Sequence, residues 1–185
     1  MKKLLALLLL TALLTTLAAC GIPEETDRLS VVATLFPQYD FARNIAGDRA
    51  DVTLLLDFGT DAHSYDPTPA DLIAIARADL FLYTGDGMEL WAKKLLQSPD
   101  VASAIERGSL TVLDLSQYVE PVCAHDHDHG HAHGEYDPHI WTSLAGADAM
   151  CVAIADALTA IDVSGAETYR VQLAAYRAQL TALRA

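Results

Sequence analysis

The chain has 185 residues, of which 52% are hydrophobic and 20% are charged, and its formal net charge is −13. This composition predicts a folded domain of ordinary size and excludes a disordered or fibrous chain. The acidity argues against nucleic acid as a partner, because negative charge repels the phosphate backbone, and it is compatible with cations as ligands.

The first residues have the pattern of an export signal. Two lysines precede an apolar run from Leu4 to Leu14, and residues 17–20 then read Leu-Ala-Ala-Cys. A positive start, a short apolar run and small residues before a break are typical of a secretory signal, and the run is too short to span a membrane stably. We expect residues 1–19 to be a signal peptide and residues 20–29 to be a polar tether.

The cysteine that ends this segment carries a second signal. Residues 17–20 resemble the lipobox of bacterial lipoproteins, which implies cleavage before Cys20 and lipid on its sulfur. The lipid would hold the protein on the outer face of the cell membrane or in the periplasm. An ordinary signal peptide with an incidental cysteine is the alternative. Outside the cytoplasm Cys123 and Cys151 can form a disulfide, although Cys123 also lies beside histidines and is a candidate metal ligand.

Strand and helix patterns alternate along the rest of the chain. We predict strands at residues 30–36, 51–56, 80–83 and 110–113, and helices at residues 37–47, 69–77, 88–96 and 148–162. The alternation predicts an α/β fold with a four-stranded, mainly parallel sheet flanked by helices. In such sheets ligands bind beyond the carboxyl ends of the strands, so the loops after the second and fourth strands are candidate sites.

The last segment has a different pattern. Tyr169, Leu173, Tyr176, Leu180 and Leu183 follow one another at spacings of 4, 3, 4 and 3 residues, which predicts one apolar stripe on a long helix. The pattern stops at the end of the sequence without a cap. We expect this stripe to be exposed when the chain is produced alone, and the chain to associate through it.

Two single histidines follow predicted strands. His63 lies in the loop after the second strand, and His139 lies at the end of the long loop, residues 116–139, after the fourth. Neutral imidazole is a good ligand for zinc and its neighbours in the transition series. Two imidazoles on adjacent loops would make half of a tetrahedral site. Taken singly, each histidine is more typical of a hydrogen-bonded loop residue than of a metal ligand.

The long loop also contains a histidine tract without apolar residues. Such a tract cannot pack into a core, and its density of imidazole predicts weak binding of metal ions at several positions. Because imidazole must lose its proton to bind a metal, this capture should weaken below about pH 6.5. The tract histidines are His125, His127, His129, His131 and His133.

These features together resemble the metal-specific solute-binding lipoproteins of bacterial ABC importers, the zinc- and manganese-binding group that includes adhesin-like proteins. The resemblance runs from residue 30 to residue 185, and His63 and His139 stand where the family has its first two metal-binding histidines. Its strongest blocks are Phe36–Ala42, Gly59–Asp71, Trp91–Leu95 and Asp137–Trp141.

The resemblance implies a fold of two lobes joined by one long helix, with the ion in the cleft between them. Residues 30–162 would then be the first lobe and residues 163–185 the start of the helix, and the second lobe, which supplies another histidine and a carboxylate, would be absent. The histidine-rich loop resembles that of zinc-specific members, which favours Zn²⁺ over Mn²⁺. The family usually has prolines where this chain has Asp57, Ala62 and Leu144.

The function implied is capture of Zn²⁺, or alternatively Mn²⁺, for a membrane permease and its ATPase. A surface adhesin or a zinc-buffering lipoprotein without a transport role is the alternative. The sequence has no Gly-x-Ser-x-Gly elbow, no His-Glu-x-x-His helix and no phosphate-binding glycine loop. We therefore expect a binding protein with no catalytic residues rather than a metalloenzyme.

Overall fold

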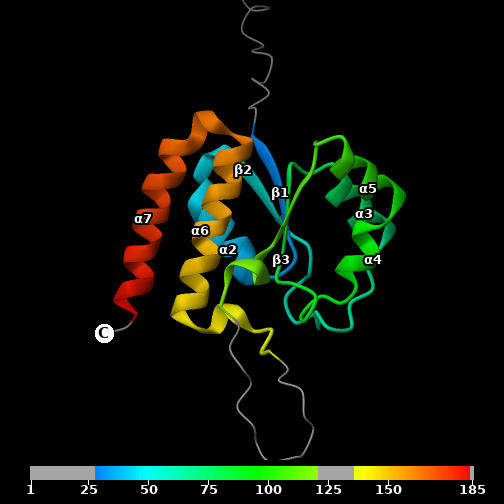
Figure 1. Cartoon of the computed structure of the whole chain (residues 1–185), viewed down its shortest axis with the longest axis horizontal. Coiled ribbons are helices and arrows are strands. Elements are labelled where there is room, and N and C mark those ends of the chain that lie inside the picture. The colour runs from blue at the N-terminus through cyan, green and yellow to red at the C-terminus, as the bar shows by residue number, and fades with distance from the viewer. Residues whose placement is uncertain (1–27, 121–135, 184–185) are drawn as a thin grey trace, which may run out of the picture.

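The computed structural model describes residues 28–120 and 136–183. Its four strands form one sheet in the order β2-β1-β3-β4, and each neighbouring pair is parallel (Figure 1). This arrangement confirms the predicted fold class. The strands are β1 (Leu29–Ala33), β2 (Ala50–Leu54), β3 (Leu80–Tyr83) and β4 (Thr111–Asp114).

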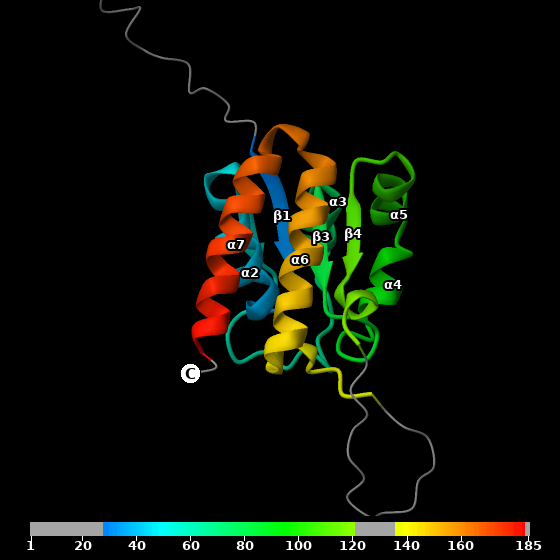
Figure 2. The same cartoon turned by 60° about the vertical axis from the view of Figure 1, so that its left-hand side comes forward.

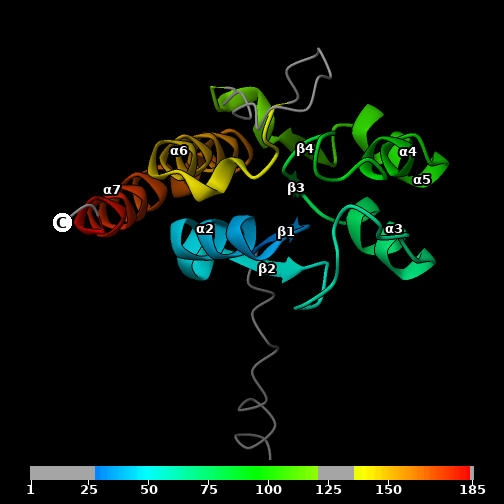
Figure 3. The ribbon, with the colours of Figure 1, turned by 90° about the horizontal axis from the view of Figure 1, so that it is seen from below.

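Helices cover both faces of the sheet (Figures 2 and 3). On one face lie α2 (Phe36–Ala46), α6 (Leu144–Ile161) and α7 (Ala166–Ala182), and on the other lie α3 (Pro69–Ala76), α4 (Ala92–Leu96) and α5 (Pro99–Glu106). Strand β3 is buried along its whole length because its side chains alternate between the two layers. Leu80 and Leu82 pack toward α2 and α6, whereas Phe81 and Tyr83 pack toward α3, α4 and α5.

The start of α3 follows from its first residues. Thr68 Oγ1 accepts a hydrogen bond from the Asp71 backbone N–H at 3.3 Å, and Asp71 Oδ2 accepts one from the Thr68 N–H at 2.7 Å. This reciprocal pair satisfies two amide groups that a helix start leaves unpaired, and Pro69 adds a suitable φ at the first helical position. The predicted start at Pro69 is confirmed, and it ends the loop that carries His63.

Several predicted boundaries are wrong for local reasons. Strand β1 ends at Ala33, because Phe36 already belongs to α2. The segment predicted as a helix over 88–96 is α-helical only from Ala92, and α5 was not predicted although Ser98-Pro99-Asp100 resembles the start of α3. Helix α6 begins four residues earlier than predicted, because the Ser143 hydroxyl caps it by accepting from Gly146 N–H at 2.9 Å.

Helix α7 packs along α2 and α6, so the predicted exposure of its apolar stripe is wrong for most of its members, whereas the predicted association of the chain stays a prediction. Tyr169 is fully buried. Leu173, Tyr176 and Leu180, the next three members of the stripe, are partly buried against the core cluster that includes residues of α2 and α6. The Tyr176 hydroxyl donates to Asp40 Oδ2 at 2.8 Å, and its ring meets Phe41 edge-on. Leu183, the last member, is 74% exposed.

Helix α6 is long and apolar enough to cross a membrane by length and composition alone, with a mean hydropathy of 1.6. Its apolar side chains instead form the centre of the core between the sheet and α7, including Met150, Ile154 and Leu158, which are fully buried. The helix therefore has the packing of a core helix of a globular domain. Because every neighbouring pair of strands is parallel, the loops that follow β2, β3 and β4 all leave the same end of the sheet (Figures 1 and 2).

Candidate metal centre

His63 lies on the loop between β2 and α3, and an aspartate shapes the turn around it. Asp61 Oδ1 accepts a hydrogen bond from the His63 backbone N–H at 3.0 Å, and Asp61 Oδ2 accepts one from the Ser64 hydroxyl at 2.8 Å. The Ser64 hydroxyl and then the His63 N–H hold the pKa of the Asp61 carboxyl below its usual value. The backbone is thus fixed in an Asx turn, while the His63 side chain is exposed.

His139 lies just before the short 3-10 helix Ile140–Thr142, and an aspartate holds both its backbone and its ring. Asp137 Oδ1 is 2.9 Å from the His139 backbone nitrogen and 2.7 Å from ring Nδ1. These two contacts, the backbone N–H first, lower the pKa of Asp137. Because an ionised carboxylate only accepts hydrogen bonds, a proton on Nδ1 fits the ring contact, and Nε2 is then the nitrogen available to a metal ion.

The two rings approach each other across the end of the sheet. Their centroids are 5.9 Å apart and their planes are inclined at 75°. Zn–N bonds of about 2.0–2.1 Å at a tetrahedral angle put two imidazole centroids roughly 5 Å apart. The observed separation of the centroids is therefore close to the spacing that two imidazoles on one ion would need, and both side chains are exposed to solvent.

The described residues supply this pair and no larger cluster. Within residues 28–120 and 136–183, no group of three or more histidine, cysteine, aspartate or glutamate side chains is placed to hold one ion. Two imidazoles occupy half of a tetrahedral coordination shell. The candidate centre is therefore an incomplete one, open toward the loop end of the sheet.

Most of the other predicted site residues do not fall in the part of the chain that the structure describes. Cys20, Cys123 and the five tract histidines lie outside the described residues, so lipidation, tract binding and the disulfide stay predictions. Cys151 is fully buried in α6, and burial raises the pKa of its thiol to about 12. A thiol with that pKa is protonated near neutral pH and is a poor nucleophile there.

Sequence reasoning missed the two aspartates that organise the histidines. Both stand two residues before a histidine, as Asp61-Ala62-His63 and Asp137-Pro138-His139, and each accepts from the histidine's backbone N–H. The repeated Asp-x-His spacing was the available signal. Only the structure distinguishes them, since Asp137 contacts the imidazole ring.

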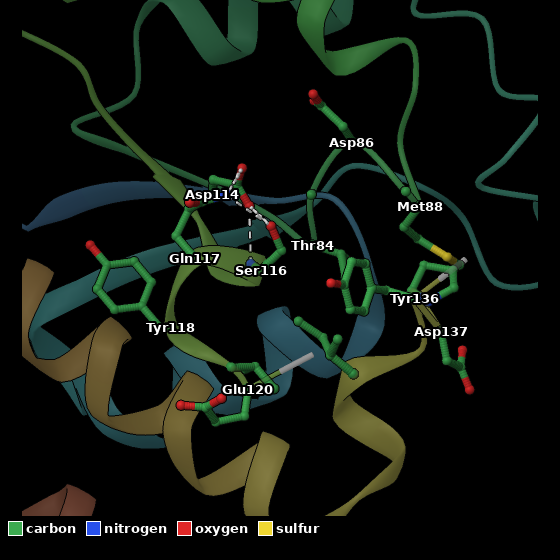
Figure 4. A pocket seen from close by; sticks show the side chains of 15 residues that line it. Thr84, Asp86, Met88, Asp114, Ser116, Gln117, Tyr118, Glu120, Tyr136 and Asp137 are labelled. Carbon is green, nitrogen blue, oxygen red and sulfur yellow. Dashed lines mark hydrogen bonds between the residues drawn. The ribbon is translucent and has the colours of Figure 1, made fainter. Parts of the chain in front are cut away.

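A cavity of about 750 Å³ lies beside the pair at the carboxyl ends of β3 and β4 (Figure 4). Asp137 and Pro138 line it, whereas neither histidine does, so it adjoins the candidate centre without containing it. Gly85 lies at its wall with φ of 139°, and a Cβ there would meet Ser116 Oγ at 2.6 Å. Its carboxylates are Asp86, Asp114, Glu120 and Asp137.

Comparisons with known proteins find metal-binding relatives of this chain. The chain is 36% identical over 187 residues to the zinc-binding lipoprotein AdcA of Streptococcus pneumoniae, which covers 99% of this chain and 37% of AdcA. It is 35% identical over 150 residues to the high-affinity zinc uptake system protein ZnuA of Bacillus subtilis, which covers 77% of this chain and 47% of that protein. The chain thus spans between a third and a half of the length of these relatives.

A solved structure and a family model also match this chain. The fold matches the Zn(II)-bound ZnuA-like domain of Streptococcus pneumoniae AdcA with a TM-score of 0.70 and 31% identity, over 84% of this chain and 53% of that one. The model of the family described as ZnuA, zinc-uptake complex component A, periplasmic, matches residues 31–185. With this family match over most of its length, the chain belongs to the ZnuA family.

Proposed function

We propose that this protein is the extracytoplasmic substrate-binding component of an ABC importer, and that it captures Zn²⁺, with Mn²⁺ as the alternative cargo, and passes it to a permease with its ATPase. The observation that carries the proposal is the approach of the His63 and His139 rings to 5.9 Å in a chain of the ZnuA family. Binding and release suffice for this role, and we propose no catalytic step.

In the proposed site the two imidazoles bind the cation through nitrogens that carry no proton. Asp137 holds one ring by its Nδ1, which leaves Nε2 for the ion and makes that nitrogen more basic. A third and a fourth ligand come, in this proposal, from a second lobe. The greater length of the relatives supports this part, since the chain covers 47% of the Bacillus subtilis protein.

We further propose that residues 1–19 direct export, that lipid on Cys20 anchors the protein, and that residues 20–29 tether the domain of residues 30–162. The name of AdcA as a lipoprotein supports the anchor. The histidine-rich loop would collect ions at low affinity near the paired histidines. The residues proposed for this collection are His125, His127, His129, His131 and His133.

Calorimetric titration with Zn²⁺ tests the proposed ligands. In a variant whose five tract histidines are glutamine, His63→Ala and His139→Ala should each weaken binding at least tenfold, because each removes one of two bonds from this chain to the ion. Thr60→Ala, an exposed substitution in the same loop that removes no ligand, is the matched control. Unchanged affinity in both histidine variants would show that the pair is not the site.

A measurement of zinc uptake distinguishes the transport role from the zinc-buffering alternative. Accumulation of labelled zinc in zinc-limited cells should rise when a full-length form carrying this domain is supplied with its permease. The gain should vanish when the permease gene is deleted. Equal protection of cells with and without the permease would instead support the zinc-buffering alternative.

A further inference from the structure

A small apolar cluster lies beside the paired histidines, and its side chains take no part in the proposed coordination of the cation. Leu56, Ala62 and Met88 are its buried members, exposed by 3%, 3% and 8%. Two tryptophans pack against it, Trp91 and Trp141. The cluster therefore joins the loop of His63 to the segment that follows His139 and to the segment after β3.

Trp91 makes a side-chain hydrogen bond from its own segment to the loop that carries His63. Its indole Nε1 donates to the Ala62 carbonyl oxygen at 2.8 Å, directly before His63. Its ring meets Tyr65 edge-on with centroids 5.3 Å apart, two residues after His63. One side chain from another element thus contacts the loop on both sides of this histidine, at the Ala62 backbone and at the Tyr65 ring.

The element that carries Trp91 is itself firmly fixed. Two residues before it, Glu89 is fully buried and accepts hydrogen bonds from Thr34 at 2.6 Å and from the Gly85 backbone at 3.1 Å. On the other side α4 begins, and its Leu95 N–H donates to the Trp91 carbonyl at 3.1 Å. The indole is therefore presented by a rigid support, whereas the His63 loop has no regular structure of its own from 57 to 68.

We propose that Trp91 is a positioning residue that holds His63 in register with His139 and so prepares the pair to bind a cation. The proposal rests on the proposed function of the pair. Holding a ligand before the ion arrives lowers the ordering cost of binding. The corresponding contact on the other side is Trp141, whose ring meets His139 at 5.5 Å and packs on the same cluster.

A purely structural role for Trp91 makes a different prediction. Loss of packing would lower the free energy of unfolding, and the folded molecules would still bind Zn²⁺ with the original affinity. A positioning role acts through His63, so its effect on affinity must disappear when that imidazole is absent.

The test measures Zn²⁺ affinity by calorimetry, in the chain whose tract histidines are glutamine. Trp91→Phe keeps an aromatic ring but removes the N–H donor, and we expect a three- to tenfold loss of affinity, about the effect of one hydrogen bond. In the His63→Ala background the same substitution should change affinity less than twofold. Tyr176→Phe, which deletes the hydrogen bond between α7 and α2, is the control for lost stability without lost affinity.

A second variant covers the case in which Trp91→Phe does not fold. Benzothienylalanine at position 91 keeps the two-ring shape and replaces the N–H by sulfur, and it should give the same loss. Affinity unchanged in the folded variant, or reduced equally with and without His63, would overturn the positioning role while leaving the site intact. If His63→Ala itself has no effect, the proposed function and this inference fail together.

Discussion

Two aspartates with the same spacing to a histidine make different contacts. Asp137 meets both the backbone N–H and the ring Nδ1 of His139, whereas Asp61 contacts only the backbone of His63 and the Ser64 hydroxyl. A carboxylate that accepts a hydrogen bond from one imidazole nitrogen orients the ring and makes the other nitrogen a stronger metal ligand. The two aspartates therefore form a matched pair for separating ring orientation from turn geometry.

Replacing each aspartate by asparagine tests this difference. Asp137→Asn should weaken Zn²⁺ binding about tenfold, because an amide is a poorer partner for the Nδ1 proton than a carboxylate. Asp61→Asn should weaken it less, since it leaves the His63 ring untouched. Both are read by calorimetry in the chain without tract histidines. Equal losses in the two variants would mean that only the turns matter.

At the scale of elements, a buried carboxylate ties the strand ends that carry the site loops. Glu89 accepts from the hydroxyls of Thr34 and Thr84 and from the backbone N–H groups of Thr84 and Gly85. Burial raises the pKa of Glu89, and these hydrogen bonds work against that rise. The side chain connects the ends of β1 and β3, where the helix expected from residue 88 is replaced by a turn.

Glu89→Gln should therefore destabilise the domain. The amide puts a donor where the carboxylate accepted from backbone N–H groups, and one unsatisfied buried group costs about 1–3 kcal/mol. The free energy of unfolding is measured by urea denaturation at neutral pH. Glu106→Gln, an exposed change at the end of α5, should alter it by less than about 0.5 kcal/mol. Equal stability of the two variants would contradict the bridging role of Glu89.

At the scale of the whole molecule, one aspartate connects segments more than 100 residues apart, since Asp162 and Arg49 are separated by 113 positions. Asp162 Oδ2 accepts from Arg49 Nε at 2.7 Å and from the Tyr169 hydroxyl at 2.7 Å. Burial alone would raise the pKa of Asp162. The hydrogen bonds from Ser164, Tyr169 and Arg49 outweigh burial and hold its pKa well below the ordinary 3.8.

This shift predicts how stability depends on pH. A carboxyl whose pKa is lower in the folded state adds stability above its ordinary pKa and loses it as the pH falls below about 4. Urea denaturation should show the wild-type chain losing stability below that pH. The Asp162→Asn variant should be less stable at neutral pH, and its free energy of unfolding should fall less as the pH is lowered below about 4. A variant that keeps the full acid dependence would show that other carboxyls cause it. Asp51→Asn, in an exposed pair with Arg28, is the control.

Local patterns predicted the fold better than its boundaries. The capping residues Thr68-Pro69-Ala70-Asp71 located α3 correctly, because both partners of that cap lie within four residues. The turn before α4 was missed, because Glu89 bonds to residues brought near it by the sheet, as far away as Thr34. The helical period of the last segment was predicted correctly. The surface that its apolar stripe packs against was not predicted, because the spacing of apolar residues does not indicate which element will cover them.

The sequence by itself determined the class of fold, the family and the two candidate ligands, because alternation of strands and helices, capping residues and histidine spacing are local properties of the chain. Only the tertiary structure decided that the two rings face one another at 5.9 Å, that Asp137 holds one of them, and that Trp91 holds the loop of the other. The ring pair and the Trp91 contact join residues on the separate connections that follow β2, β3 and β4, and their distances depend on how the parallel strands align at one end of the sheet.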